Sequence, residues 1–571
     1  MNYKDAVIYQ IYPRSFADSN GDGIGDLPGI ASKLDYLAEL GVDILWLSPI
    51  FDSPNADNGY DVSDYEAIMP EFGTMADFDN LLAGVHQRGM RLILDLVVNH
   101  SSDEHRWFQE SRKSKDNPYR DYYIWRTPKL TADGPAEPNN WQSIFSGPAW
   151  AFDETTGEYY LHLFATKQPD LNWEHPPLRE AIYKMMRFWL DKGVDGFRMD
   201  VIPFLSKDQT FPDYPAGRYG DSSVHANGPR IHEFLQEMNH EVLSRYGRAG
   251  EGCVSIGEGI GVTAELANLY VGKDRHELNM IYHFDHAVPR EEYRFVDPAP
   301  EFTVLELKAI FAKWNLALDS IDPATQATGG WQNIYFGNHD NPRCISRFGD
   351  PERYPYESAT MLATVLLTQR GTPNIYQGDE IGMTNCAFDT IDEYNDIQVK
   401  NAWQALITQG EHSPEVFLAT ANQIARDHAR TPMQWSDAPN AGFTTGQPWL
   451  KINHNYQTIN VSQQEATPRS VLHYYQKLLR WRKQTLAIHE GTYSDLLPDH
   501  PSLWVFERTL NNVTFYTVAN FSGDFVVIPV IQGVSLSDNQ LVLANLPNQT
   551  DTLQPFEARI YERKKTGISD E

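Results

Sequence analysis

Residues 196–200 read Gly-Phe-Arg-Met-Asp, a short apolar run that contains one arginine and ends on an aspartate. Strands of a parallel sheet are covered on both faces, so they are apolar along their length, and charged side chains are expected where they end. The stretch therefore predicts a buried strand over 196–200 that delivers ionisable groups to one edge of a parallel sheet.

Seven further short runs of this kind occur along the chain, and longer amphipathic stretches separate them, as in parallel strands linked by helices. With 196–200 they make eight strands over about 480 residues, more chain than a minimal barrel uses, so large insertions are expected in the loops. We predict an α/β fold, a (β/α)8 TIM barrel. The other seven strands are predicted at residues 6–11, 44–47, 91–97, 254–258, 280–284, 333–337 and 373–377.

The segments outside these units predict two additions to the barrel. Residues 101–176, after the third strand, are rich in Trp, Tyr, Asn and Pro and predict an inserted loop-rich subdomain. Alternating apolar residues over 503–508, 513–518 and 524–530 predict a C-terminal antiparallel β-sandwich domain. The predicted division is 1–100 and 177–488 for the catalytic barrel, 101–176 for the insertion and 489–571 for the β domain, with 564–571 as a frayed tail.

Composition narrows the possible ligands and surroundings. The 571 residues, 41% of them hydrophobic, exclude a single small binding module. The 47 Lys and Arg against 77 Asp and Glu give a formal charge of −30, which disfavours nucleic acid and favours neutral or cationic ligands. Three cysteines and the lack of a leader-like start or an 18-residue apolar run predict a cytoplasmic protein that does not enter a membrane. We expect a monomer.

Ionisable side chains stand at the ends of four predicted strands. The segments are Asp95–His100, Gly196–Val201, Gly257–Glu258 and Gly337–Asp340. The loops at the C-terminal face of a barrel converge on one mouth, so these groups should meet there. Carboxylates, histidines and an arginine without cysteines suit acid–base chemistry on a neutral sugar, and His100 and His339 are both expected to take functional roles.

Cleavage of a glycosidic bond needs one protonated and one ionised carboxyl group. Asp200 and Glu258 are the expected pair. Arg198 lies two residues before Asp200 and on the same side of the pleat, so we expect it to keep Asp200 ionised as the nucleophile by lowering its pKa. Glu258 has no basic residue close in sequence and is expected to stay protonated as the general acid. Adjacent strands favour the close spacing of retaining enzymes.

In their order and placement, these four segments resemble the four signature regions of the α-amylase family of glycoside hydrolases. The resemblance extends along nearly the whole chain and is greatest to the oligo-1,6-glucosidase and sucrose-isomerase group. It implies that Asp200 is the nucleophile, Glu258 the acid/base and Asp340 a third carboxylate that stabilises the distorted sugar ring. Further segments carry it at Gln10–Phe16, Asp57–Asp61, Gln168–Asn172 and Ala429–Trp435.

The resemblance also implies a pocket for the non-reducing glucose unit of a small oligosaccharide or disaccharide. Asp57 and Arg430 are expected to pair and close this pocket, so that the protein attacks one end unit at a time. Among aromatic side chains that could stack on a sugar face, Phe145 and Phe164 are assigned to the site, and Tyr12 and Trp46 are weaker candidates. The expected substrate-binding residues are Asp57, Tyr60, His100, Phe145, Phe164, Gln168, Arg198, His339, Arg343 and Arg430.

The loop over residues 18–26 carries oxygen-bearing groups at alternate positions. Such spacing can wrap a hard divalent cation, and the family resemblance implies a structural Ca²⁺ here, remote from the chemistry. The alternative is a Gly-rich turn that Asx hydrogen bonds hold together. The proposed ligands are Asp18, Asn20, Asp22, Asp26 and the backbone carbonyl of Ile24.

The residue after the nucleophile bears on linkage. In relatives, valine at the position of Val201 accompanies α-1,6 preference, whereas alanine or threonine accompanies α-1,4 preference. We therefore expect isomaltose, isomaltulose and short isomaltosaccharides to be better substrates than maltose. Sucrose isomerisation or transglucosylation is the first alternative, against which stand Met199–Val201 and the loop 284–290, which lacks an Arg-rich run.

Three weaker alternatives remain. An α-1,4-glucosidase differs from the expected activity only in linkage. Trehalose-6-phosphate hydrolysis would need a cationic phosphate pocket that the sequence does not reveal. A catalytically silent partner of a membrane transporter would have lost catalytic carboxylates, whereas this chain keeps all three.

Overall fold

The computed structural model describes residues 2–563 except 133, 216–223, 248–251, 288–294, 296–301, 320–328, 409, 411, 532 and 548–549. The predicted tail over 564–571 lies outside the described residues, as does part of the loop 284–290. Within the described ranges, no helix is both long and apolar enough to span a bilayer.

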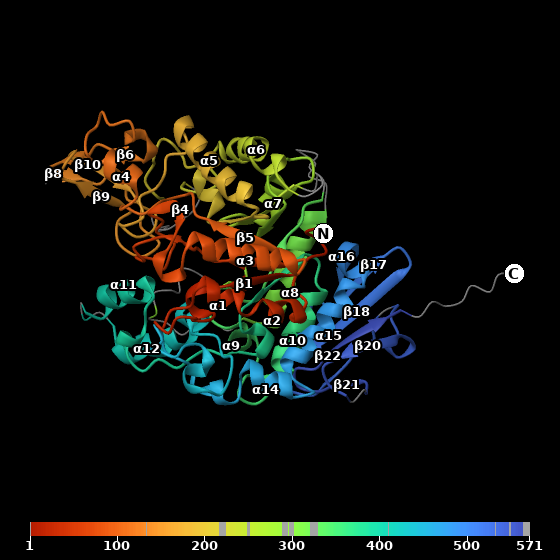
Figure 1. Cartoon of the computed structure of the whole chain (residues 1–571). Helices are drawn as coiled ribbons and strands as arrows, with labels where there is room; N and C mark the ends of the chain where they lie inside the picture. Colours follow the sequence, from red (N-terminus) through yellow and green to blue (C-terminus); the bar gives the residue numbers. More distant parts are fainter. Residues whose placement is uncertain are drawn as a thin grey trace.

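Eight parallel strands form the central barrel, which confirms the predicted fold class (Figure 1). β1 pairs with both β2 and β15, and a bridge between Ile281 and Gln332 joins β13 to the segment before β14, so the sheet closes on itself. The strands are β1 (Ile8–Ile11), β2 (Ile44–Leu47), β5 (Arg91–Leu96), β11 (Gly196–Met199), β12 (Val254–Glu258), β13 (Met280–Tyr282), β14 (Asn333–Ile334) and β15 (Thr372–Tyr376).

Each strand serves two apolar layers because its side chains alternate in direction. On β1, Ile8 belongs to the cluster that fills the barrel interior, together with Trp46 and Ile256. Val7 and Tyr9 point the other way, into the larger cluster between the strands and the helices. This double burial explains why the strands read as continuous apolar runs rather than alternating ones.

Helices follow the strands and cover the outside of the barrel (Figure 1). They begin and end as their capping residues predict: Thr74 caps α3 in a capping box, and Gly193 ends α5 in the left-handed conformation. The main covering helices are α2 (Leu34–Leu40), α3 (Met75–Gln87), α5 (Pro176–Lys192), α6 (Ile231–Glu241), α7 (Ala264–Val271), α8 (Val304–Asp319), α10 (Pro355–Thr368) and α15 (Val471–Lys483), with the shorter α1 (Leu27–Ala31), α9 (Cys344–Phe348), α14 (Val461–Ala466) and α16 (Leu486–Glu490) between them.

The segment between the third and fourth barrel strands is irregular, as predicted. It packs Trp141, Phe145 and Phe164 into a separate apolar cluster that also includes Val201, directly after β11. The insertion therefore reaches the mouth of the barrel. Its elements are α4 (Arg106–Ser111), the sheet of β6 (Trp125–Arg126), β10 (Glu158–Leu161) and β9 (Trp150–Asp153), and the hairpin of β7 (Lys129–Thr131) and β8 (Gly134–Ala136); a smaller hairpin, β3 (Phe51–Asp52) and β4 (Asp64–Ile68), follows β2.

A second insertion, which the sequence analysis did not separate from the barrel, follows β15. It contains α11 (Ile397–Leu406), α12 (Pro414–Ile424) and α13 (Asp427–Arg430), and it has its own apolar cluster. Figure 1 places α11 and α12 on the same side of the barrel as β9 and β10. The two insertions touch where Asn401 Nδ2 donates to the carbonyl of Phe145, at 3.0 Å.

The C-terminal domain packs on the opposite side of the barrel from these insertions (Figure 1). One face of its five-stranded antiparallel sheet places Trp504 and Phe506 in the barrel cluster, and the other face packs Val505 and Val518 against a short two-stranded sheet. The predicted strand over 524–530 is shortened to two residues. The five strands are β16 (Thr492–Asp495), β17 (Leu503–Leu510), β18 (Val513–Asn520), β22 (Ala558–Glu562) and β20 (Gln540–Ala544); β19 (Val526–Val527) pairs with β21 (Thr552–Leu553).

Candidate active site

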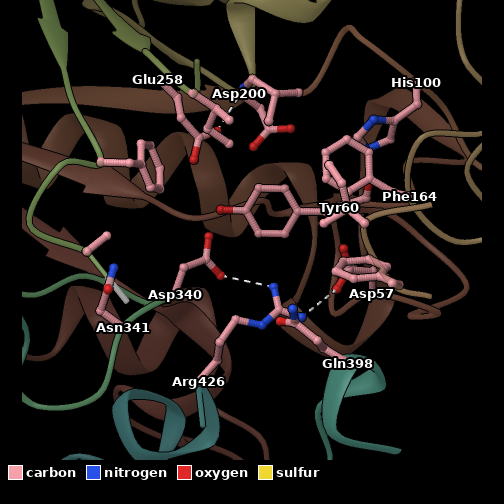
Figure 2. Close-up of a pocket in the computed structure, with 16 residues that line it drawn as sticks. Asp57, Tyr60, His100, Phe164, Asp200, Glu258, Asp340, Asn341, Gln398 and Arg426 are labelled. Atoms are coloured by element: carbon pink, nitrogen blue, oxygen red, sulfur yellow. Dashed lines mark hydrogen bonds and ion pairs between the residues drawn. The ribbon is translucent and has the colours of Figure 1, made fainter. Parts of the chain in front are cut away.

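A pocket lies where the C-terminal ends of the barrel strands meet the two insertions, and it collects most of the predicted site residues (Figure 2). The barrel strand ends and the loops that follow them supply its carboxylates, the first insertion supplies Phe145 and Phe164, and the second supplies Gln398 and Arg426. The other predicted residues that line it are Asp57, Tyr60, His100, Asp200, Glu258 and Asp340.

Arg198 is the electrostatic centre of the site. Its guanidinium is fully buried and contacts three carboxylates: Asp95 at 2.7 Å, Asp200 at 2.9 Å and Glu258 at 2.8 Å. Tyr282 Oη accepts from Nε and Nη2, at 3.0 and 2.6 Å. One cation thus holds three acidic side chains from neighbouring strands in fixed positions, which is the precision that a reacting geometry needs.

The prediction that Arg198 keeps the pKa of Asp200 below its ordinary value is wrong. Burial raises the pKa of Asp200 well above its ordinary value, and the adjacent Glu258 and Asp95 carboxylates add to this effect, while Arg198 opposes it. Arg198 also contacts Glu258, which sequence distance alone did not suggest. The reason is that the barrel brings the ends of β11 and β12 together, so the arginine is shared rather than dedicated to one carboxylate.

The Asp200 and Glu258 side chains lie within hydrogen-bonding reach of each other, and this contact contributes to the raised pKa of Asp200. This contact is closer than the separation in inverting glycosidases, which must leave room for a water between the carboxyl groups. The main-chain N–H of Val201 donates to Glu258 Oε2 at 2.8 Å. Val201 can aim its N–H this way because it adopts a left-handed backbone, with φ 37° and ψ 43°.

Asp340 carries a negative charge that neighbouring cations stabilise. Burial alone would raise its pKa, but the guanidinium groups of Arg426 and Arg430 lower the pKa of Asp340 well below its ordinary value. Arg430 Nη2 and Arg426 Nη1 contact Asp340 Oδ1 at 2.9 and 3.1 Å. Asp340 is thus held as an anion on the side of the pocket that faces Tyr60 (Figure 2).

The histidines are buried and neutral rather than cationic. Burial lowers the pKa of His339 to about 3 and that of His100 to about 4. Gln10 Nε2 lies 2.7 Å from His339 Nδ1, and the phenol of Tyr60 lies 2.6 Å from Nε2, with its ring stacked on the imidazole. Both histidines therefore serve as fixed hydrogen-bonding groups, and His100 also packs against Phe164.

The predicted pair that closes the pocket is partly wrong. Arg430 turns to Asp340 and to the carbonyl of His339, whereas Arg426 is the arginine that reaches Asp57, at 3.6 Å. Gln168 Nε2 donates to the other Asp57 oxygen at 3.2 Å. Burial raises the pKa of Asp57 to about 7, although Arg426 and Arg430 oppose the shift. An aspartate and an arginine, Asp57 and Arg426, thus still meet in the pocket wall.

Seven sequence candidates lie outside the pocket wall. Four of them contact residues that line it, namely Gln168, Arg198, His339 and Arg430, and the other three are Arg343, Tyr12 and Trp46. Arg343 is buried and donates to the carbonyls of Gln377 at 2.5 Å and of His428 and Ala429 at 3.3 Å each. It therefore supports the chain beneath the site and is turned toward the main chain rather than toward a sugar. Tyr12 and Trp46 pack around His339, at ring-centroid distances of 6.2 and 6.0 Å.

Asp18 and Asp26 accept hydrogen bonds from main-chain N–H groups in and next to the loop 18–26. Asp18 accepts from the N–H groups of Asn20, Gly21 and Gly23, and Asp26 accepts from Ser19 and Gly29. In the described part of the chain, no three His, Cys, Asp or Glu side chains are grouped to hold a metal ion. A cation here would need Asn20 and the Ile24 carbonyl as well as the carboxylates, so Ca²⁺ stays a prediction.

Sequence reasoning missed three polar residues of the pocket wall. Asn341 directly follows Asp340, and Gln398 and Arg426 come from the second insertion. Arg426 stands only four residues before Arg430, so spacing alone could not decide between the two arginines. Recognising the helical insertion over α11–α13 as a unit at the barrel mouth would have pointed to Arg426, because such loops carry the site in this fold.

Comparison with known proteins agrees with this geometry. The family model for the α-amylase catalytic domain matches residues 10–491. The chain is 52% identical to an oligo-1,6-glucosidase of Halalkalibacterium halodurans and 50% identical to one of Parageobacillus thermoglucosidasius, each over 98% of both chains. The crystal structure of the trehalulose synthase of Pseudomonas mesoacidophila MX-45 superposes with a TM-score of 0.91 at 42% identity, over 98% of this chain and 99% of the other. With its barrel, its site and these relatives, the chain belongs to the α-amylase family of glycoside hydrolases.

Proposed function

We propose that this protein is a retaining α-glucosidase that releases the terminal non-reducing glucose from short oligosaccharides and prefers α-1,6 links. The observation that carries the proposal is the contact between Asp200 and Glu258 in a pocket that Asp57 and Arg426 close at its end. Two carboxyl groups this close suit nucleophile and acid/base, rather than two groups with a water between them.

In the first step, Asp200 attacks the anomeric carbon while Glu258 gives its proton to the leaving oxygen, so the glycosidic bond breaks and a glucosyl ester forms. In the second step, Glu258 takes a proton from water, whose oxygen displaces Asp200 and restores both side chains. Asp340, held ionised, faces the positive charge that develops on the ring.

The closed end of the pocket explains attack at chain ends. Asp57 and Arg426 lie 3.6 Å apart in the pocket wall, and Asp57 Oδ1 is buried with no hydrogen-bond partner among the described residues. Such groups suit the hydroxyls of a terminal glucose. A chain that continued beyond this unit would have to separate the two side chains.

The preference for α-1,6 links rests on Val201 and on the relatives. Val201 lines the pocket beside Glu258, where the leaving group must sit. The two relatives at 50% and 52% identity are named oligo-1,6-glucosidases. The three cysteines are free and buried, which suits a reducing compartment, and we propose a monomeric cytoplasmic enzyme.

Product analysis tests this function. The enzyme is incubated separately with isomaltose, isomaltulose, maltose, sucrose and trehalose, and products and anomeric configuration are followed by NMR. We expect α-glucose first, released mainly from the 1,6-linked sugars. Release of β-glucose would contradict the retaining mechanism, and new disaccharides from sucrose would assign the sucrose-isomerase alternative, as in the structural neighbour named trehalulose synthase.

A further inference from the structure

The guanidinium of Arg426 lies between two pocket carboxylates and is held from behind by a third. Toward the pocket, it contacts Asp340 at 3.1 Å and Asp57 at 3.6 Å (Figure 2). On its other side, the Asp396 carboxylate accepts two hydrogen bonds from one edge of the guanidinium: Nε donates to Oδ2 at 2.9 Å and Nη2 donates to Oδ1 at 2.5 Å. These two hydrogen bonds are shorter than the contacts of Arg426 with Asp340 and Asp57.

Asp396 is fully buried, and hydrogen bonds of both its main chain and its side chain fix its position. Its main-chain N–H donates to Asp427 Oδ2 at 2.9 Å, and the neighbouring Asn395 N–H donates to the same oxygen at 2.7 Å. Its side chain also caps α11 by accepting from the N–H of Gln398 at 3.0 Å. Asp396 therefore stands behind two residues of the pocket wall, Arg426 and Gln398.

We propose that Asp396 is a positioning residue that acts through Arg426: it holds the guanidinium in the end wall of the pocket so that Asp57 and Asp340 are bridged for a terminal glucose. This role rests on the proposed glucosidase function of the same pocket. Asp396 itself touches neither the sugar nor the reacting atoms.

The physical reason is the freedom of an arginine side chain. Three carboxylates compete for one guanidinium, and a long side chain has many rotamers, so contacts on the pocket side alone would leave its position loosely defined. A buried carboxylate that accepts two hydrogen bonds from the guanidinium restricts the arginine rotamers before the sugar binds. The entropy cost of ordering the arginine is then met when the protein folds rather than when the sugar binds, so the affinity for the sugar increases.

The simpler interpretation is that Asp396 only caps α11. The two roles separate on one substitution, because an asparagine oxygen caps a helix as well as an aspartate oxygen does. Asp396→Asn therefore keeps the acceptor for the Gln398 N–H but removes the charge from the fork. A pure capping role predicts almost no effect, whereas the positioning role predicts weaker sugar binding.

A double-mutant cycle tests the proposal with Asp396→Asn, Arg426→Lys and the double variant. Two quantities are measured: kcat/KM for p-nitrophenyl α-glucoside, and the Kd of glucose by calorimetry in an Asp200→Asn background. Asp389→Asn is the matched control, since Asp389 is an exposed aspartate of the same insertion and its carboxylate pairs with Lys451 at the surface.

We expect Asp396→Asn to lower kcat/KM by about 10- to 100-fold, mostly through KM, because a charged hydrogen-bonded pair is lost. The double variant should fall within about twofold of Arg426→Lys alone, because Asp396 has nothing left to hold. The control should match the wild type. Should Asp396→Asn not fold, Asp396→Glu, which keeps the charge but displaces it by one methylene, enters the same cycle.

Losses that multiply in the double variant, or an Asp396→Asn enzyme that binds glucose like the wild type, would overturn the proposal. The result stays separate from the proposed function. A wild type that prefers maltose to isomaltose would refute the linkage preference, but the double-mutant cycle could still be measured with p-nitrophenyl α-glucoside. A wild type that cleaves no α-glucoside refutes the activity, while glucose binding still reports on Asp396.

Discussion

The main-chain N–H of Val201 donates a hydrogen bond to Glu258, with its nitrogen 2.8 Å from Oε2, and does so from a left-handed backbone conformation. A β-branched residue rarely adopts this conformation, so the surrounding structure must hold it there. The same residue thus orients the acid/base through its main chain and narrows the leaving-group space through its side chain. These two effects can be separated by substitution.

Substitution of Val201 should change linkage preference. Val201→Thr keeps the branched shape and the main-chain hydrogen bond but places a hydroxyl beside the leaving group. We expect the ratio of kcat/KM for isomaltose to that for maltose to fall by about tenfold, a typical size for one altered group in a pocket. Initial rates on both sugars provide the measurement, and Val201→Ala serves as a second variant. An unchanged ratio in both would remove Val201 from specificity.

Asp200→Asn should abolish turnover and improve stability above acidic pH. Loss of the nucleophile should lower kcat by a factor on the order of 10⁴ or more. Burial, Glu258 and Asp95 raise the pKa of Asp200 in the folded protein, so the folded state holds the proton more tightly than the unfolded one. The wild type therefore loses stability as pH rises above about 4, the pKa of an unfolded aspartate.

The asparagine cannot ionise, so the melting temperature of Asp200→Asn should equal that of the wild type at low pH and exceed it at pH 7. Thermal melts of both proteins across this pH range give the comparison. A variant that melts lower than the wild type at pH 7 would show that the Asp200 charge stabilises the fold, contrary to the assignment.

Glu258→Gln should distinguish leaving groups. Isomaltose needs a proton on its leaving oxygen, so its turnover should fall by about 10³-fold, whereas α-glucosyl fluoride, whose leaving group needs no acid, should be affected much less. Azide should accelerate the variant and yield α-glucosyl azide, because it attacks the glucosyl ester without a general base. Equal losses on both substrates, with no response to azide, would refute the acid/base assignment.

Arg343→Gln should lower stability and leave sugar binding intact. The guanidinium satisfies three buried carbonyls, and their loss costs about 2 kcal/mol or more. We expect a lower melting temperature and a KM for p-nitrophenyl α-glucoside close to that of the wild type. A KM that rises at an unchanged melting temperature would instead restore the substrate-binding role predicted from the sequence.

Chelation tests the predicted Ca²⁺ in the loop 18–26. A cation bound only by the folded protein would raise its melting temperature, so EDTA should lower it and added Ca²⁺ should restore it. Asp22→Asn is the sharper probe: its oxygen can still accept from the Ile24 N–H, at 2.8 Å in the wild type, but one charge is lost. If exhaustive chelation and this variant both leave the melting temperature unchanged, the loop is held by Asx turns alone.

The sequence predicted the barrel because each of its strands carries the pattern locally. The runs over 44–47 and 254–258 match β2 and β12 residue for residue, since an apolar run bounded by polar residues defines both ends of a buried strand. The second insertion was missed because α11 and α12 resemble ordinary barrel helices in sequence. Only their separate apolar cluster and their position at the mouth set them apart.

Within the site, the sequence predicted which carboxylates meet and failed on how charge is shared among them. The strand ends of Asp200 and Glu258 are local features, whereas the contacts of Arg198 with three carboxylates depend on the curvature of the closed sheet. The same limit explains the exchange of Arg430 for Arg426 opposite Asp57. A motif identifies the residues that stand next to a catalytic group in sequence. Which side chains contact each other across a pocket can be known only from the folded structure.

The pairing of β1 with β15 also has a consequence for synthesis on the ribosome. Ile8 is in register with Asn374, so the first barrel strand to be made must wait for more than half of the polypeptide before its second neighbour exists. During that interval one edge of β1 remains open to incorrect partners. Ribosome stalling or premature termination before residue 372 would therefore yield nascent chains prone to aggregation and dependent on chaperones, however stable the finished enzyme is.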